Sequence, residues 1–239
     1  MTRTTILQVI LGLDLGQTQD PTAAALLLDM EQTVSPYSWI DSTHRTTRRW
    51  QLASTRLWPL ETAYTQVAID LKRICRRIQR QYPATPLILL CDATGIGRPT
   101  LEMIHKELQS PGEASPARIE GIVFTGGATV SESRHPALPV NLFHVPRLDL
   151  IQTLLQAIES RQLQAAPGLE DAARLATQLK SLRYTESRST GQTGIEVHKS
   201  AAHPETANAD LVMALAMATW RMKTLAPSSS KPPNRLPGF

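Results

Sequence analysis

The stretch Ile10-Leu11-Gly12-Leu13-Asp14-Leu15-Gly16 decides the fold, because an apolar run ends there in an acid and a glycine. This pattern is typical of a buried strand that stops at a turn. A second apolar run occupies residues 22–29, after the short polar segment 16–21. We therefore expect two strands joined by a turn, the second antiparallel to the first, with Asp14 at the end of a central strand.

Two further acids stand at the ends of apolar segments. Asp92 closes the run Leu87-Ile88-Leu89-Leu90-Cys91-Asp92, and Asp210 opens an apolar helix expected over residues 208–224. A helix predicted over residues 60–80 connects the first sheet strands to the run 86–92, and right-handed crossovers bring the ends of such parallel strands to one edge. Oxygen ligands of this kind suit Mg²⁺ and point to metal-dependent phosphodiester chemistry.

The remaining segments predict the fold class. The expected elements are a polar strand near 37–50, a helix over 98–109, a strand over 119–124, an irregular region over 126–144, helices over 147–160 and 169–183, and a hairpin of 182–188 with 195–199. Strands followed by alternating helices and strands predict an α/β fold. We expect a mixed central sheet with helices on both faces.

Composition limits the class of protein. The chain has 239 residues, of which 41% are hydrophobic, and this is enough for one well-sized core. We expect one domain over residues 1–224 and a flexible Pro/Ser-rich tail over 225–239. Cys75 and Cys91 form no C-x-x-C pair and are interpreted as buried reduced thiols. Neither a membrane span nor a signal peptide is readable, which predicts a cytoplasmic protein with no membrane partner.

An ordered set of segments resembles a known family. The segments are Gly12-Leu13-Asp14-Leu15-Gly16-Gln17-Thr18-Gln19-Asp20-Pro21-Thr22-Ala23, Cys91-Asp92-Ala93-Thr94-Gly95-Ile96-Gly97-Arg98-Pro99, Phe124-Thr125-Gly126-Gly127, His144-Val145-Pro146-Arg147 and Asp210-Leu211-Val212-Met213-Ala214-Leu215-Ala216. In this order they resemble the nuclease domain of phage terminase large subunits, a branch of the RNase H-like superfamily. The match covers nearly all of residues 8–222. The resemblance implies an endonuclease that cuts concatemeric phage DNA during genome packaging in a bacterial host cell.

The same resemblance implies roles for three acids, and the position of Asp20, six residues after Asp14 and just beyond the turn, suggests a fourth ligand. Asp14, Asp92 and Asp210 would be the catalytic carboxylates that hold Mg²⁺ or Mn²⁺, with Asp14 between two ions. Asp20 would add a further oxygen, directly or through water. Simpler interpretations exist, since aspartate is common in turns and at helix starts. Clustered acids repel one another, so we expect at least one carboxyl pKa to be raised when no metal is bound.

Partners follow from charge and from the resemblance. The net charge of +4 and the sequence pI of about 9.3 suit double-stranded DNA. Arg183, Arg188 and Lys199, on or near the expected hairpin, are the candidate DNA contacts. No G-x-x-x-x-G-K-[ST] motif is present, so we expect no ATPase domain. A separate terminase ATPase, a small terminase subunit or a portal would then be partners, or the chain would be a free-standing nuclease or a prophage remnant.

Two alternatives remain open. Members of the family often carry two neighbouring acids where this chain has Ala209-Asp210, which leaves the second metal ion in question and keeps a nuclease-dead DNA- or portal-docking module open. The strand-Asp-x-Gly opening and the segment Val123-Phe124-Thr125-Gly126-Gly127-Ala128 also resemble ATP-dependent small-molecule kinases of actin-like fold. Those kinases have no evident use for an acid at the start of the last apolar helix.

Overall fold

The computed structural model describes residues 2–16, 20–34, 45–95, 97–109, 115–186, 193–197 and 209–225 of the chain. Its strands are β1 (Thr2–Asp14), β2 (Ala23–Val34), β3 (Arg45–Leu57), β4 (Leu87–Asp92), β5 (Arg118–Thr125), β6 (Ser131–Arg134), β7 (Asn141–Pro146), β8 (Leu163–Ala165), β9 (Leu182–Glu186) and β10 (Thr193–Val197). Its helices are α1 (Tyr64–Gln81), α2 (Gly97–Leu108), α3 (Arg147–Glu159), α4 (Ala172–Ser181) and α5 (Asp210–Leu225).

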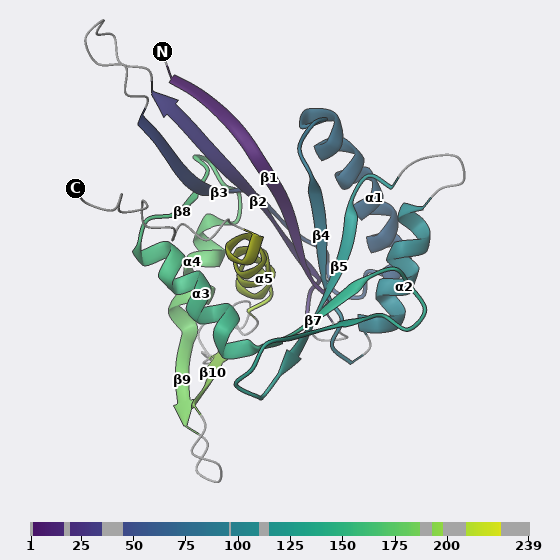
Figure 1. Cartoon of the computed structure of the whole chain (residues 1–239). Helices are drawn as coiled ribbons and strands as arrows, with labels where there is room; N and C mark the ends of the chain where they lie inside the picture. The colour runs from purple at the N-terminus through teal and green to yellow at the C-terminus, as the bar shows by residue number, and fades with distance from the viewer. Residues whose placement is uncertain are drawn as a thin grey trace, which may run out of the picture.

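One mixed sheet organises these elements, in the strand order β6-β7-β5-β4-β1-β2-β3-β8 (Figure 1). Strands β1, β4, β5 and β7 run parallel to one another, whereas β2 is antiparallel to both β1 and β3. Strands β9 and β10 form a separate antiparallel hairpin, as predicted from the sequence. The parallel strands therefore end at a common edge of the sheet.

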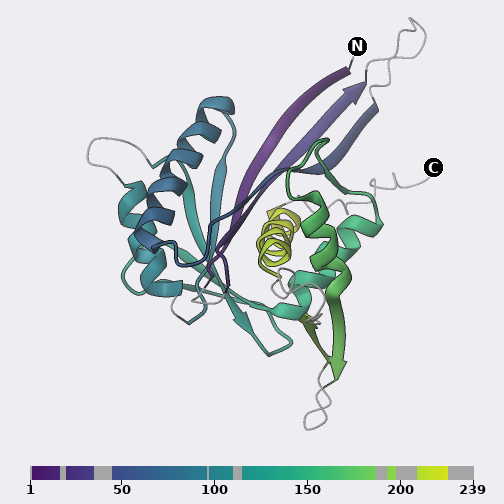
Figure 2. The same cartoon turned by 180° about the vertical axis from the view of Figure 1, so that it is seen from behind.

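Helices cover both faces of the sheet (Figures 1 and 2). In β1, Val9, Leu11 and Leu13 pack in the core that contains α1 and α2. Ile10 packs in the opposite core, which contains α3, α4 and α5. This alternation follows from the two-residue period of a strand. The predicted α/β fold, a mixed central sheet with helices on both faces, is confirmed.

Helix α5 is buried on nearly all sides, as expected of a helix that is apolar around its whole circumference. It lies directly on β1 and β2. A Cβ atom added at Gly12 would lie 2.2 Å from the backbone oxygen of Ala214 and 3.2 Å from the Cβ of Ala218. Only glycine at position 12 therefore allows α5 to approach β1 this closely, and this contact places the start of the helix beside the end of the strand.

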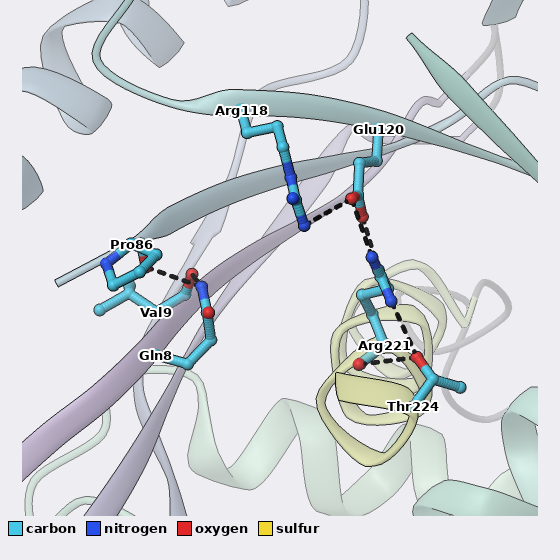
Figure 3. Close-up of polar contacts among 7 residues, drawn as sticks. All are labelled: Gln8, Val9, Pro86, Arg118, Glu120, Arg221 and Thr224. Atoms are coloured by element: carbon cyan, nitrogen blue, oxygen red, sulfur yellow. Dashed lines mark hydrogen bonds and ion pairs between the residues drawn. The ribbon is translucent and has the colours of Figure 1, made fainter. Parts of the chain in front are cut away.

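The far end of α5 is attached to the sheet by a buried ion pair (Figure 3). Arg221 donates from Nε to Oε2 of Glu120 at 2.6 Å and from Nη2 to Oε1 at 2.9 Å. Arg118 adds a third contact to Glu120 at 2.8 Å, and the Arg221 guanidinium lies 4.7 Å from the ring centroid of Phe143. At the same end of the sheet, Gln8 Nε2 donates to the carbonyl oxygen of Pro86 at 2.7 Å.

The structure differs from the sequence prediction mainly between β5 and α3. The region 126–144, predicted to be irregular, contains β6 and β7. Strand β6 reads Ser-Glu-Ser-Arg and is exposed throughout, so no apolar alternation marks it. The polar strand predicted near 37–50 is β3, which runs on to Leu57. Of its predicted span, residues 37–44 lie outside the described residues.

Two other sequence predictions concern thiols and membrane segments. Cys75 and Cys91 are buried free thiols, as predicted, and burial raises the pKa of both. Among the described residues, none of the helices has the length and apolar character needed to cross a membrane. The predicted tail, apart from Leu225 at the end of α5, lies outside the described residues.

Candidate active site

The ends of β1 and β4 bring Asp14 and Asp92 side by side. Leu13 pairs with Cys91 in the parallel register, so the next residue of each strand is an aspartate. Two-residue periodicity places Asp14 on the same face as Ile10, and Asp92 on the same face as Ile88. Both isoleucines belong to the core beneath α5. The prediction that topology would join these two acids at one edge agrees with the structure.

The turn after β4 holds Asp92 in place. The backbone N–H of Thr94 donates to Asp92 Oδ1 at 2.8 Å, and the Thr94 hydroxyl accepts from the N–H of Phe124 at 2.9 Å. This is the local bonding by which aspartate favours turns. A Cβ atom added at Gly97 would lie 2.4 Å from the Asp92 carbonyl oxygen. Glycine there lets α2 begin directly against the strand end.

Asp210 reaches the same edge from the start of α5. It is 7% exposed, and its Oδ2 atom has no hydrogen-bond partner among the described residues. The N–H of Val212 instead donates to Oε1 of Gln178, a buried glutamine of α4, at 3.3 Å. Gln178 therefore satisfies a free N–H of the first helical turn. Oδ2 of Asp210 is thus left without a partner among the described residues, and nothing in the sequence pattern singles out Gln178 for this role.

The carboxyl groups of all three acids have raised pKa values. Burial raises the pKa of Asp14 well above its ordinary value, and Asp92 and Asp210 raise it further. Burial also raises the pKa of Asp92, although hydrogen bonds from Thr94 work against the shift. Burial, followed by the nearby charge of Asp20, raises the pKa of Asp210 to about 7. The expected raised carboxyl pKa values are present at this site.

Asp20 lies beside the cluster, on an exposed turn. Its charge acts on the pKa of both Asp14 and Asp210. The ends of the turn are fixed by two hydrogen bonds to Gly16: its N–H donates to Thr22 Oγ1 at 3.1 Å, and its carbonyl accepts from the Tyr64 hydroxyl at 2.6 Å. Residues 17–19 lie outside the described residues.

Two exposed arginines flank the acids. Arg147, the first residue of α3, lowers the pKa of Asp14, Asp92 and Asp210 alike. Arg174 of α4 lowers that of Asp210. Sequence reasoning did not assign either arginine to the site, although Arg147 closes the segment 144–147. Arg147 could have been found from its position, because it follows directly after β7, a strand that ends at the edge where the acids lie.

The predicted DNA contacts stay predictions. Arg183 is exposed on β9, where its Nη1 donates to the carbonyl oxygens of Lys180 at 2.6 Å and Leu182 at 2.8 Å. Arg188 and Lys199 lie outside the described residues.

The oxygen donors at this edge are of the kind that a hard divalent cation prefers. Within the described residues, no three His, Cys, Asp or Glu side chains are placed so that they could hold one. The cluster nevertheless offers only oxygen donors, including the unpartnered Oδ2 of Asp210. The raised pKa values mean that neighbouring arginines do not offset burial and repulsion. The assignment of Asp14, Asp92 and Asp210 as ligands of Mg²⁺ or Mn²⁺ stays a prediction.

Comparison with solved structures finds a viral nuclease domain. The human cytomegalovirus terminase nuclease domain, Mn soaked, is 14% identical with a TM-score of 0.49, over 90% of this chain and 82% of that one. The same domain with Mn and an inhibitor bound is 13% identical with a TM-score of 0.46, over 89% and 83%. No family model and no curated protein matches the chain. With TM-scores below 0.5, function has to be inferred from the chain's own residues, and membership of the phage terminase family stays a prediction.

Proposed function

We propose that the chain is a metal-dependent endonuclease that cuts DNA at the edge formed by β1, β4 and the start of α5. The observation that carries this proposal is the convergence of Asp14, Asp92 and Asp210. They come from three elements far apart in sequence, they are wholly or partly buried, and their proton affinities are raised. A fold tolerates such repulsion where the unpaired carboxylates serve a function.

The chain's own residues supply the binding frame for hydrolysis. The Thr94 turn fixes Asp92, Gln178 relieves Asp210 of a capping role, and the Gly12 contact sets the start of α5 against β1. These carboxylates would hold a divalent ion, which would supply activation of a water molecule and neutralise negative charge on the phosphate. The two-ion arrangement with Asp14 in the middle, and Asp20 as an added ligand, belong to the same proposal.

DNA is the proposed substrate because cations flank the acids. Arg147 and Arg174 are exposed beside the cluster, and the chain carries a net charge of +4. Phosphate contacts of this type give affinity without sequence readout. Cutting of concatemeric phage DNA with a separate ATPase, small terminase subunit or portal is the specific form of the proposal. The acid at the start of α5 favours it over the actin-like kinase.

Incubation of supercoiled plasmid with the full chain tests the proposal. We expect nicking or linearisation with Mn²⁺ and, more weakly, with Mg²⁺, because Mn²⁺ is the less demanding ion at an incomplete carboxylate site. EDTA should abolish cleavage. Undiminished cutting in excess EDTA would refute the metal requirement.

Substitution of the acids tests the site itself. Asp14→Asn and Asp92→Asn each keep volume but remove an anionic ligand, so cleavage should be lost. The melting temperature without metal should be unchanged or slightly higher, because carboxylate repulsion is relieved. Glu159→Gln, an exposed change at the end of α3, is the matched control and should cut normally. An active Asp14→Asn protein would exclude the assigned site.

A further inference from the structure

Arg147 stands at the same sheet edge as the carboxylates. Strand β5 separates β7 from β4, and Pro146 pairs with Thr125 at the end of β5. Arg147 follows Pro146 directly; it lies two strands away from β4 and four residues beyond Phe143, the residue of β7 that is level with Asp92. The parallel direction of β1, β4, β5 and β7 places Arg147 at the end of the sheet where the carboxylates lie, within reach of a long side chain that extends back toward them.

Arg147 also lies on the same side of the sheet as the acids. Phe143 and Val145 of β7 pack in the core that contains Ile88 and Leu90 of β4, beneath α3 and α5. Helix α3 begins on that side with Arg147, and α3 packs against α5. The guanidinium therefore belongs to the surroundings of Asp14, Asp92 and Asp210, which agrees with its effect on all three carboxyl groups.

Arg147 is exposed, and no hydrogen bond or ion pair joins it to another described residue. A cation that served only to neutralise one acid would be expected to pair with it, as Arg221 does with Glu120. The first turn of α3 also lacks a side-chain cap, since Pro146 precedes it. A free guanidinium beside uncapped N–H groups is suited to an anion.

We propose that Arg147 is the phosphate-binding residue of this site, donating N–H groups to non-bridging oxygens of the phosphodiester that is cut. This inference rests on the proposed function, because it takes the scissile phosphate as the ligand. The simpler role is a fixed counter-charge that allows three acids to fold side by side. The two roles differ in what Arg147 does to DNA.

Arg147→Gln, Arg147→Lys and the control Arg80→Gln separate these roles. Arg80 is exposed in the last turn of α1, at the opposite edge of the sheet, and its substitution removes the same charge. Binding of a short duplex by each full-length chain in EDTA is measured against salt concentration. We expect Arg147→Gln to reduce the slope of log K against log salt by about 0.9, the value for one lost phosphate contact. Arg147→Lys should keep the slope.

Cleavage provides the second measurement. At saturating DNA and Mn²⁺, kcat of Arg147→Gln should fall about 10- to 100-fold, the loss expected for a charge-assisted hydrogen bond. Arg147→Lys should recover it only in part, because lysine cannot make the two parallel bonds of a guanidinium. Mn²⁺ affinity, measured by calorimetry without DNA, should not fall in either variant.

The outcomes keep the two proposals distinct. If the wild-type chain cuts DNA and Arg147→Gln matches Arg80→Gln in slope and kcat, the phosphate assignment is wrong while the nuclease assignment stands. A tighter Mn²⁺ affinity with an unchanged salt slope overturns it too, since that is the behaviour of a counter-charge. If the wild-type chain does not cut but Arg147→Gln still reduces the slope, the phosphate contact is supported and the nuclease proposal fails.

Discussion

The two ends of α5 bury acids against the same sheet in opposite ways. At the C-terminal end, Glu120 is 2% exposed, and arginines bond both of its oxygens. At the N-terminal end, Asp210 is 7% exposed, and its Oδ2 has no partner among the described residues. The charge of Asp20 raises the pKa of Asp210, and the charge of Asp210 in turn raises the pKa of Asp14. At the C-terminal end, which we call the complete end, the buried acid is paired with arginines. At the N-terminal end, which we call the incomplete end, Oδ2 of the buried acid has no partner among the described residues.

The difference separates attachment from chemistry. A buried ion pair with both oxygens bonded fixes the helix in position, because removal of one partner leaves an uncompensated charge. Unpaired buried acids do the opposite, since they lower stability until a proton or a cation neutralises them. We infer that the Glu120 end holds α5 on the sheet and thereby lets the Asp210 end remain destabilised for binding.

The largest expected effect comes from breaking the complete end. Glu120→Gln leaves the largely buried Arg221 guanidinium without a charged partner, so the free energy of unfolding should fall by about 3–5 kcal/mol. Urea unfolding at pH 7 measures it. Arg118→Gln is the matched control, because that side chain is 60% exposed and its loss should cost less than about 1 kcal/mol. Equal losses in the two variants would contradict the attachment role.

A second effect, smaller in size, concerns the incomplete end and pH. The pKa of Asp210 is raised to about 7 in the folded chain, so the folded state binds this proton more firmly than the unfolded state does. Stability contributed by the protonated group is therefore present below the unfolded pKa of about 4 and is lost as pH rises toward 7. Between pH 5 and pH 8 the loss should be about 2–3 kcal/mol, at about 1.4 kcal/mol per pH unit up to pH 7.

Comparison with Asp210→Asn isolates that loss. The difference in unfolding free energy between wild type and variant should change over this pH range in favour of the variant, and it should be flat above pH 8. Mn²⁺ added at pH 8 should restore stability to the wild type and less to the variant. If this difference does not depend on pH, the pKa of Asp210 in the folded chain is not raised to about 7.

The sequence predicts the acids better than their surroundings. Asp14 and Asp92 were predictable because each closes an apolar run, and parallel strands that end together must share an edge. Asp210 was predictable as an acid before an apolar helix. Strand β6 was not, because an exposed polar edge strand carries no alternation.

Residues that are joined by long-range contacts could not be predicted. Glu120 and Arg221 are 101 positions apart, and Gln178 and Val212 are 34 apart. Such pairings depend on how the helices pack against the sheet and against one another, which no local sequence pattern specifies. Arg147 is intermediate, since its place after a strand end could have been read once that strand was known. The roles of the acids as metal ligands stay predictions.

The smallest expected effect comes from making the incomplete end more acidic. Ala209 is 6% exposed and lies in the core beside the start of α5, about 100° around the helix from Asp210. An acid at 209 can therefore join the cluster only if the ion lies across the helix end. Ala209→Asp should increase cleavage several-fold at low Mg²⁺, with the difference vanishing at saturation, because a further carboxylate strengthens binding of a hard cation.

Magnesium titrations of cleavage for wild type, Ala209→Asp and Ala209→Asn decide this point. The asparagine variant has nearly the same volume as the aspartate without its charge, so it should show no gain, and both variants should lose stability without metal because a polar group is buried. If Ala209→Asp and wild type give overlapping curves, Asp20 or solvent already completes the site. The alanine at 209 would then leave the chemistry of this end of α5 intact, and the contrast with the Glu120 end would rest on Asp14, Asp92 and Asp210 alone.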